Sequence, residues 1–335
     1  MKEDIFNLDL NQFEVGKPTI ERVDFPSFYG LQKVKAPIYV YRASEETSPC
    51  VVATSCMHGD EINGLGVTQD LMNSDIKLKK GTLIIVPILN IYGFLNKTRY
   101  LPDRKDLNRC FPGSENGSFG TRFAKFVLTN FLSHADVVVD YHSGGVGRFN
   151  IPQIRCDLKH NKIEELLEDL SIPLIVNSSL REGSLRESMS KLKKACIVFE
   201  GGEGLRIDQT INKYGVNLFK SILAHFDMID NTEKFNEDKI IIQKTRWIRA
   251  KEGGLLLNQA EYGKLIKKGE IIGELKDIQG NLINQISSDC DGVILGMSKT
   301  ALIMSGDPLY NIGVIGDSPL GDDSEEFYDY FDLDT

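Results

Sequence analysis

The stretch "CVVATSCM" (residues 50–57) decides the fold, since it is a short, almost continuously apolar run that His58 follows at once. Runs of the same kind recur at "GTLIIVPIL" (81–89), "ADVVVDYH" (135–142) and "ACIVFEGG" (195–202). A continuous apolar run of this length is typical of a strand that is buried on both faces of a sheet. We therefore expect four interior strands in one sheet.

Segments with helical character separate these runs. We expect helices at 62–72, 121–133, 159–170 and 211–226, and a further strand at "IPLIVN" (172–177). Short apolar strands that alternate with helices are typical of an α/β protein whose sheet is covered on both sides. The predicted fold class is thus α/β, with a mixed, largely parallel sheet flanked by helices.

The pattern changes at the polar stretch 230–239, which we interpret as a linker. Beyond it, short strands alternate with turns that contain Gly and Asp, which predicts a small all-β module. We expect a large α/β domain at 1–236, the β module at 237–317 and a mobile acidic tail at 318–335.

The composition excludes several classes of function. The net charge of −9 argues against a broad surface for nucleic acid or anionic membrane, although a local basic pocket remains compatible with it. No apolar run approaches the roughly 20 residues that span a bilayer, and the N-terminus lacks the pattern of a signal peptide. The six cysteines show no CxxC spacing, so we expect reduced thiols in a cytoplasmic protein.

Titratable residues end three of the predicted strands. The first strand leads to His58 and Glu61, the third ends in Asp140 and His142, and the last contains Glu200. Ligands of open α/β sheets gather at the carboxyl ends of the strands, so these side chains are candidates for one site. Two imidazoles and one carboxylate form a set typical of catalytic zinc, and either Asp140 or a backbone carbonyl is a candidate to orient one imidazole.

The titratable residues at each strand end can also be explained without a metal. Glu61 alone would suit the start of a helix, in whose first turn we place it, and His58 alone would suit a loop. Asp140 and His142 alone would suit a capped strand end. Together, at two strand ends of a chain with five histidines, they favour a metal site. We expect His134, His160 and His225 to be ordinary surface or core residues.

The loop "TRYLPDRKDLNRCFPG" (98–113) concentrates arginine in an acidic chain. Arg99, Arg104 and Arg109 stand there together with Asn108. A guanidinium group can bind a carboxylate in two-point geometry or stabilise charge on a carbonyl oxygen. The alternative is a solvated basic loop.

Four motifs in order, "HGDE", "RYLPDRKDLNRCFPG", "DYHSGG" and "VFEGGEG", resemble the succinylglutamate desuccinylase/aspartoacylase family, a branch of the zinc carboxypeptidase-like (M14-type) hydrolases. The likeness covers most of residues 45–205 and implies a zinc carboxypeptidase-like fold for the larger domain. It also implies that one Zn²⁺ is bound by His58, Glu61 and His142.

The same resemblance assigns roles to further residues. It places the general base at Glu200, with Glu203 as a less favoured competitor. Asn108 and Arg109 would bind a substrate carboxylate. An upstream arginine would polarise the scissile carbonyl, for which Arg99 ranks slightly ahead of Arg104.

The β module resembles the barrel-sandwich hybrid fold of biotinyl and lipoyl carriers, chiefly in "GKLIKKGEIIGEL" and "SDCDGVIL". The carriers present a modifiable lysine at a hairpin tip, whereas the matching stretch here reads "DIQGNLINQ". We therefore expect a module that shapes access to the site and carries no prosthetic group.

The expected function is zinc-dependent hydrolysis of the amide bond of a small N-acyl amino acid. A zinc carboxypeptidase acting on a peptide-like substrate is the alternative among enzymes, and a non-catalytic binding protein is the alternative from another class. Specificity is expected from loops at 143–158 and 178–190, where anion-binding candidates compete with surface charges; these are Arg148, Arg155, Arg181 and Arg186. The resemblance also makes a homo-oligomer plausible.

Overall fold

The computed structural model describes residues 6–27, 33–230 and 239–315 of the 335-residue chain. Nearly all of the predicted linker at 230–239 and the whole acidic tail at 318–335 lie outside the described residues.

Four parallel strands form the middle of the main sheet. They lie in the order β4-β3-β5-β8, with bounds Thr82–Val86 (β4), Cys50–Ser55 (β3), Val137–His142 (β5) and Ala195–Glu203 (β8). Every residue of β3, β4 and β5 is buried, which explains why these stretches are continuously apolar. The predicted fold class, a mixed and largely parallel sheet between helices, is confirmed.

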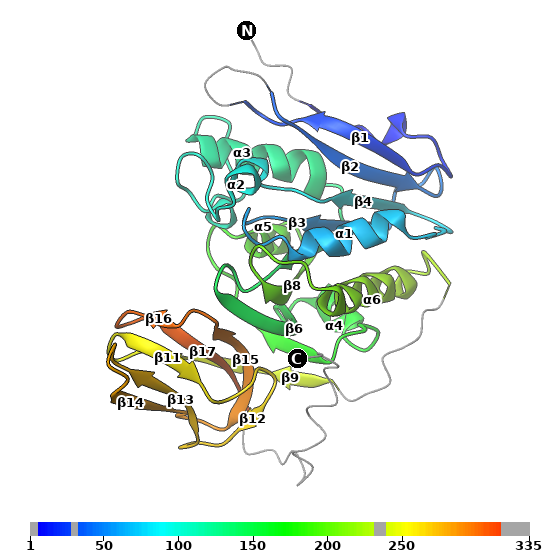
Figure 1. Ribbon diagram of the computed structural model, residues 1–335. Coiled ribbons are helices and arrows are strands. Elements are labelled where there is room, and N and C mark those ends of the chain that lie inside the picture. The colour runs from blue at the N-terminus through cyan, green and yellow to red at the C-terminus, as the bar shows by residue number, and fades with distance from the viewer. Residues whose placement is uncertain (1–5, 28–32, 231–238, 316–335) are drawn as a thin grey trace.

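Further strands extend the sheet on both sides, as Figure 1 shows. An antiparallel pair, β1 (Thr19–Asp24) and β2 (Lys35–Arg42), continues it beyond β4. On the other side β6 (Arg148–Cys156) runs antiparallel to β8, and β7 (Leu174–Asn177) and β9 (Ile240–Ile242) follow it in parallel.

Strand β6 corrects the expectation of a variable loop at 143–158. Its residues 149–154 are all buried, although Asn150 and Gln153 are polar. These interior polar residues interrupt the apolar pattern from which a strand would be predicted. The second expected loop, at 178–190, contains the start of helix α5 (Leu185–Lys191).

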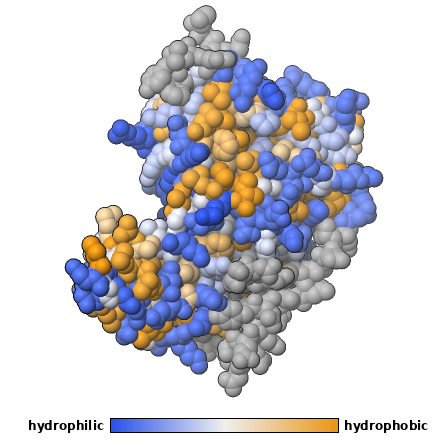
Figure 2. Space-filling view, viewed as in Figure 1, coloured by the Kyte–Doolittle hydropathy of each residue, from blue (hydrophilic) through white to orange (hydrophobic). Residues whose placement is uncertain are grey.

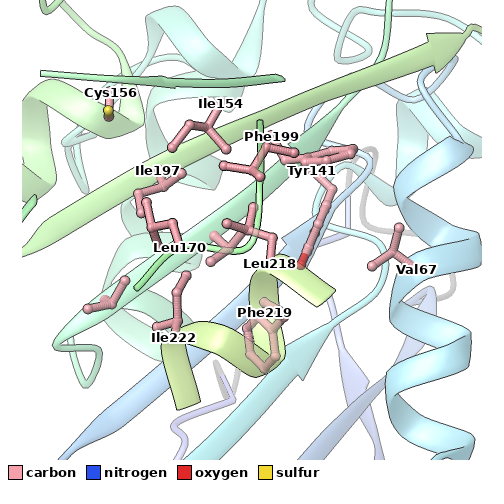
Figure 3. Packing of buried hydrophobic residues seen from close by; sticks show 14 of the residues in the cluster. Val67, Tyr141, Ile154, Cys156, Leu170, Ile197, Phe199, Leu218, Phe219 and Ile222 are labelled. Carbon is pink, nitrogen blue, oxygen red and sulfur yellow. The ribbon is translucent and has the colours of Figure 1, made fainter. Parts of the chain in front are cut away.

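Helices cover both faces of the sheet (Figure 1). Side chains alternate along β3, so that Val51 and Ala53 belong to one core cluster and Cys50 and Val52 belong to the other. The first cluster includes residues of α1 (Asn63–Asn73), α4 (Asn161–Leu166) and α6 (Gln209–His225), and Figure 3 shows part of it. The second includes residues of α2 (Ile91–Asn96), α3 (Phe119–Val127), the π-helix η3 (Leu128–Leu132) and α5, with the 3-10 turns η1 (Leu10–Gln12) and η2 (Leu107–Arg109) beside it.

None of the helices within the described ranges combines the length and the apolar character that crossing a bilayer requires.

The C-terminal β module is joined directly to the main sheet. Strand β15 (Gly292–Ser298) pairs with β6 and continues the sheet into β17 (Pro308–Val314) and β10 (Lys244–Arg249). Gly296 makes this junction possible, because a Cβ atom there would lie 2.2 Å from Oδ1 of Asn150. A separate antiparallel sheet in the order β14-β13-β11-β16 completes the module; its strands are Leu282–Ser287, Ile271–Lys276, Gly254–Asn258 and Leu302–Ile303, and the short β12 (Leu265–Ile266) pairs with β15.

The module therefore lies beside β6, one strand away from β8. A third core cluster fills it, with buried residues such as Leu256, Leu275 and Ile294. In Figure 2 the module projects from the larger part of the molecule, and a concave surface lies between the two. This placement brings β10 and the start of β17 toward the carboxyl edge of the parallel strands.

We predict that Gly64→Ala lowers the free energy of unfolding by about 1–3 kcal/mol, the usual cost of overpacking a core. A Cβ atom at Gly64 would lie 2.4 Å from Cβ of Tyr141 and 2.9 Å from Cβ of Ser55, so α1 would have to move off the sheet. Chemical denaturation measures the change. Gly253→Ala is the control, because its nearest neighbour would be 3.2 Å away; equal stability of the two variants would contradict this packing.

Candidate metal centre and substrate cavity

The turn that follows β3 positions the first two site residues. Cys56 has a φ of +52°, which turns the chain sharply after the strand. The backbone N–H of Glu61 donates to the carbonyl of His58 at 3.1 Å and closes the turn. Helix α1 begins only at Asn63, so Glu61 precedes the helix and does not lie in its first turn, contrary to the expectation from the sequence.

Asp60 also differs from its expected role of favouring the start of the helix. The N-cap of α1 is Ile62, and no side-chain hydrogen bond caps the helix there. The backbone carbonyl of Asp60 instead accepts from the N–H of Leu205, which ties the turn to the segment after β8.

The sheet register positions the other two residues. His142 is the last residue of β5, and its partner in the neighbouring strand β8 is Glu200. Because β5 and β8 are parallel, both side chains reach the same edge of the sheet as the turn after β3.

Glu61 lies between the two imidazoles. Its Oε1 is 2.8 Å from Nδ1 of His58, and its Oε2 is 2.8 Å from Nδ1 of His142. The backbone N–H of Ser143 also donates to Oε2, at 3.3 Å. One ligand atom from each of His58, Glu61 and His142 lies within 4.8 Å of the others, and all three residues are buried.

A carboxylate holds the far nitrogen of each imidazole. Nε2 of His142 is 2.8 Å from Asp140, whose other oxygen accepts from the hydroxyl of Thr54. Nε2 of His58 is 3.2 Å from Asp106. The expected role of Asp140 in orienting an imidazole is confirmed, whereas Asp106 was not singled out from the sequence.

This arrangement fits a metal cation. Ionised carboxylates only accept hydrogen bonds, so the far nitrogens of His58 and His142 carry hydrogens. Each Nδ1 then presents its lone pair: that of His58 faces Oε1 of Glu61 and Nη1 of Arg99, and that of His142 faces Oε2 of Glu61. Two imidazole nitrogens and one carboxylate, each imidazole supported by a second carboxylate, are the ligands typical of catalytic zinc.

The electrostatics of the cluster agree with this fit. Burial opposes charge on Glu61, yet the imidazoles of His58 and His142 hold the pKa of its carboxyl well below the ordinary value. Burial likewise opposes charge on His142, while Asp140 and Glu61 raise its pKa well above the ordinary value. The buried carboxylates thus attract positive charge to this point.

Arg99 reaches the same cluster. Its Nη1 lies 3.2 Å from both Nδ1 of His58 and Oε1 of Glu61. Its Nε and Nη2 donate to one oxygen of Asp106 at 3.2 and 2.8 Å. Asp106 therefore holds Arg99 and His58 together at the edge of the site.

The cluster opens into a cavity of about 400 Å³. Besides the three candidate ligands, its described lining includes Glu200, Asn108, Arg99 and Arg109, which are among the predicted site residues. It also includes all four arginines that were considered as anion-binding candidates, namely Arg148, Arg155, Arg181 and Arg186.

Glu200 and its competitor Glu203 are clearly separated by the structure. Glu200 lines the cavity, accepts a hydrogen bond from Nδ2 of Asn150 at 2.9 Å and lies 3.9 Å from Nε of Arg155. Glu203 pairs with Arg206 at 3.4 Å and is not among the described residues that line the cavity.

The structure also separates the predicted substrate-binding residues by whether they line the cavity. Oδ1 of Asn108 accepts from the N–H of Leu185 at 2.9 Å, which ties η2 to the start of α5. Arg104 lies in an exposed turn with a φ of +62°, and it is absent from the described lining of the cavity. Of the two candidates for the carbonyl-polarising arginine, only Arg99 is brought to the cavity.

Sequence reasoning did not find the residues that the module contributes. Trp247 and Arg249 of β10 and Pro308 of β17 form part of the cavity wall. They lie 100 residues or more beyond His142. The sequence predicted only that the β module shapes access to the site. The alternation W-x-R along a strand places both side chains on one face and is the signal that the sequence offered.

The fold and the site together define an α/β protein with a His-Glu-His centre at the carboxyl edge of its sheet. The model of the succinylglutamate desuccinylase/aspartoacylase catalytic domain matches residues 48–226. Because the match spans more than half of the chain, the chain belongs to this family.

Relatives agree with this assignment. N-alpha-acetyl-L-2,4-diaminobutyric acid deacetylase of Halomonas elongata is 23% identical over 304 residues, which are 85% of this chain and 87% of the relative. The product-bound ectoine utilization protein EutE (DoeB) of Ruegeria pomeroyi has a TM-score of 0.81 at 21% identity, covering 92% of this chain and 97% of that one.

A succinylglutamate desuccinylase/aspartoacylase of Rhodobacter sphaeroides has a TM-score of 0.78 at 21% identity, covering 92% of this chain and 98% of that one. At these identities the solved structures show a shared fold. The family is one of deacylases that act on N-acyl amino acids, and the curated relative is named as a deacetylase.

We predict that the purified protein contains about one zinc per chain, as expected for three protein ligands with an open position. His58→Ala should abolish this content, and Asp140→Asn should weaken metal affinity by about 10–100-fold because it removes the partner of His142. Elemental analysis and competition with a chelator measure the two effects. His134→Ala is the control, since His134 is not among the described cavity residues; zinc retained in full by His58→Ala would refute the site.

Proposed function

We propose that the protein is a zinc-dependent deacylase that hydrolyses the amide bond of an N-acyl amino acid. The observation that carries this proposal is the position of Glu200 in the same cavity as the cluster of His58, Glu61 and His142. A carboxylate beside three metal ligands is what metal-assisted hydrolysis of an amide requires. The family membership supports the same reaction class.

His58, Glu61 and His142 would hold Zn²⁺, which would supply Lewis acidity to the attacking water and the scissile carbonyl when bound. Glu200 accepts the proton of that water and passes it to the leaving amine. Its hydrogen bond from Asn150 keeps the carboxylate directed into the cavity. Arg99, held by Asp106, stabilises the negative charge that develops on the carbonyl oxygen.

Asn108 and Arg109 are proposed to bind the carboxylate of the amino acid. Both line the cavity, and the bond from Leu185 fixes the amide of Asn108. Arg109 is exposed and has the fork of donors that suits a carboxylate. A substrate held at this point presents its amide bond to the reacting groups in a fixed orientation.

We also propose the cytoplasm as the compartment of the protein, because all six cysteines are unpaired and buried.

We predict that Glu200→Gln retains zinc but loses activity by about 10²–10⁴-fold, the usual contribution of a general base. Steady-state kinetics with the best substrate and elemental analysis of the same sample measure both quantities. Glu203→Gln is the matched control and should retain activity, since Glu203 pairs with Arg206 outside the described cavity lining. Full activity of Glu200→Gln would disprove this assignment.

A substrate screen tests the reaction class. Release of free amino acid is followed from N-acyl amino acids, N-alpha-acetyl-L-2,4-diaminobutyric acid among them, and in parallel from short peptides. We expect hydrolysis of N-acyl amino acids and little or none of peptides. Preferential release of C-terminal residues from peptides would favour a carboxypeptidase, and zinc-loaded protein without activity on any compound would favour a binding protein.

A further inference from the structure

Strand β6, which lies between β8 and β15 in the sheet (Figure 1), contains a β-bulge. Two residues of β6, Ile151 and Pro152, stand opposite the single residue Gly201 of β8. An extra residue of this kind shifts the alternation of side chains along the strand by one position. Proline suits such a position, because a bulge leaves one residue outside the ladder of hydrogen bonds.

The bulge sorts the side chains of β6 onto two faces. The apolar residues before and after it belong to the same core cluster; they are Phe149, Ile151, Ile154 and Cys156. The polar residues therefore share the opposite face; they are Arg148, Asn150, Gln153 and Arg155. A strand without the bulge would have turned half of these polar side chains into the apolar core. The bulge is thus what brings the polar residues of β6 to the side of the cavity.

One of these residues, Asn150, holds the carboxylate of Glu200. Nδ2 of Asn150 donates to Oε2 of Glu200 at 2.9 Å, and no other hydrogen bond to this carboxylate is found within the described part of the chain. Nε of Arg155 lies 3.9 Å from the other oxygen, which is beyond hydrogen-bond distance. Asn150 is only 5% exposed, so solvent has little access to its amide. The orientation of the Glu200 side chain therefore depends on Asn150.

The β module contacts Asn150 from the other side. Gly296 of β15 is the partner of Asn150 in the pairing of β6 with the module. A Cβ atom at Gly296 would lie 2.2 Å from Oδ1 and 3.3 Å from Cγ of Asn150, so the amide packs directly against the backbone of the module. Oδ1 is buried and has no hydrogen-bond partner among the described residues. Packing against Gly296 is therefore what fixes this end of the amide.

We propose that Asn150 is a positioning residue for Glu200, and that the β module holds Asn150 in place through Gly296. The module then acts on the rate of the reaction, in addition to forming one wall of the cavity. Asn150 acts only through its hydrogen bond, and proton transfer remains the task of Glu200. The inference rests on the proposed function, in which Glu200 is the general base.

The variant Asn150→Leu tests the hydrogen bond, because leucine has nearly the shape of asparagine but no donor. We expect kcat of the full-length, zinc-loaded protein to fall by about 10–100-fold, since a reacting group misplaced by about 1 Å has a cost of this order. KM and zinc content should change little, because Asn150 contacts none of the three candidate metal ligands. Steady-state kinetics with the best substrate of the screen and elemental analysis measure these quantities.

Gln153→Leu is the matched control on the same strand. Gln153 is also buried, but its amide donates to the carbonyl of Leu295 in β15 at 3.2 Å, and it is not among the described cavity residues. This variant removes a link between β6 and the module and leaves the hydrogen bond to Glu200 in place. It should lower Tm and retain kcat. An equal loss of kcat in the two variants would mean that a loosened strand explains the effect, and would refute the role of Asn150.

Two glycine variants test the contribution of the module. Gly296→Ala should lower both Tm and kcat, because the added Cβ atom displaces the amide of Asn150. Gly254→Ala is similarly crowded, since its Cβ atom would lie 2.7 Å from the carbonyl oxygen of Lys276, but Gly254 belongs to the separate sheet of the module. It should lower Tm and retain kcat. Equal kcat values for the two variants would refute an effect of the module on the rate.

Crystal structures of the zinc-loaded wild type and Asn150→Leu provide a test that does not depend on turnover. We expect one orientation of the Glu200 carboxylate in the wild type and a displaced carboxylate in the variant. An unmoved carboxylate would refute the positioning role, and so would loss of zinc from Asn150→Leu, which would indicate an effect on the metal centre. A displaced carboxylate without hydrolysis of any compound in the screen would refute the proposed reaction and leave the positioning role standing. Hydrolysis with an unchanged kcat in Asn150→Leu would do the reverse.

Discussion

The contact of the Glu61 carboxylate with two imidazoles is the constraint on which the site depends. One oxygen faces His58 in the turn after β3, and the other faces His142 at the end of β5. A buried carboxylate is costly unless cations or hydrogen bonds surround it, so the turn, the strand end and the backbone of Ser143 must meet at one point. A bound zinc ion would be held by the same three side chains. The centre is therefore set by the sheet itself.

The parallel register also positions the groups that are proposed to react. His142 and Glu200 are partners across β5 and β8, so the position of the proposed base follows from the strand that places a ligand. On the other side Asp106 contacts both His58 and Arg99, which couples the metal centre to the arginine proposed to stabilise the oxyanion. Strand ends and hydrogen-bonded turns hold these side chains, and such preorganisation is the usual basis of electrostatic catalysis.

The sequence was sufficient to predict the parallel strands, four of the covering helices and the candidate ligands, because buried strands are continuously apolar and their ends carried conspicuous titratable residues. Helices α2 and α5 were not predicted. The sequence was also insufficient for β6, whose buried Asn150 and Gln153 break the apolar pattern that prediction relies on. Those residues are polar because one side of β6 faces the cavity and the module: Asn150 donates to Glu200, and Gln153 donates to a carbonyl of β15. Contacts such as that of Arg148 with Trp247 depend on tertiary pairing and leave no local trace.

The pairing of β15 with β6 explains how the module contributes to the cavity. Strand β15 pairs with β6 and continues the main sheet through β17 to β10. The position of β10 relative to the parallel strands is therefore fixed by the sheet. The Gly296 contact that permits this junction involves Asn150, the residue that also holds Glu200. A change in how the module docks would therefore move the base and Arg249 together. The module thus forms one wall of the cavity, and strand β6 joins it to the residue that holds the proposed base.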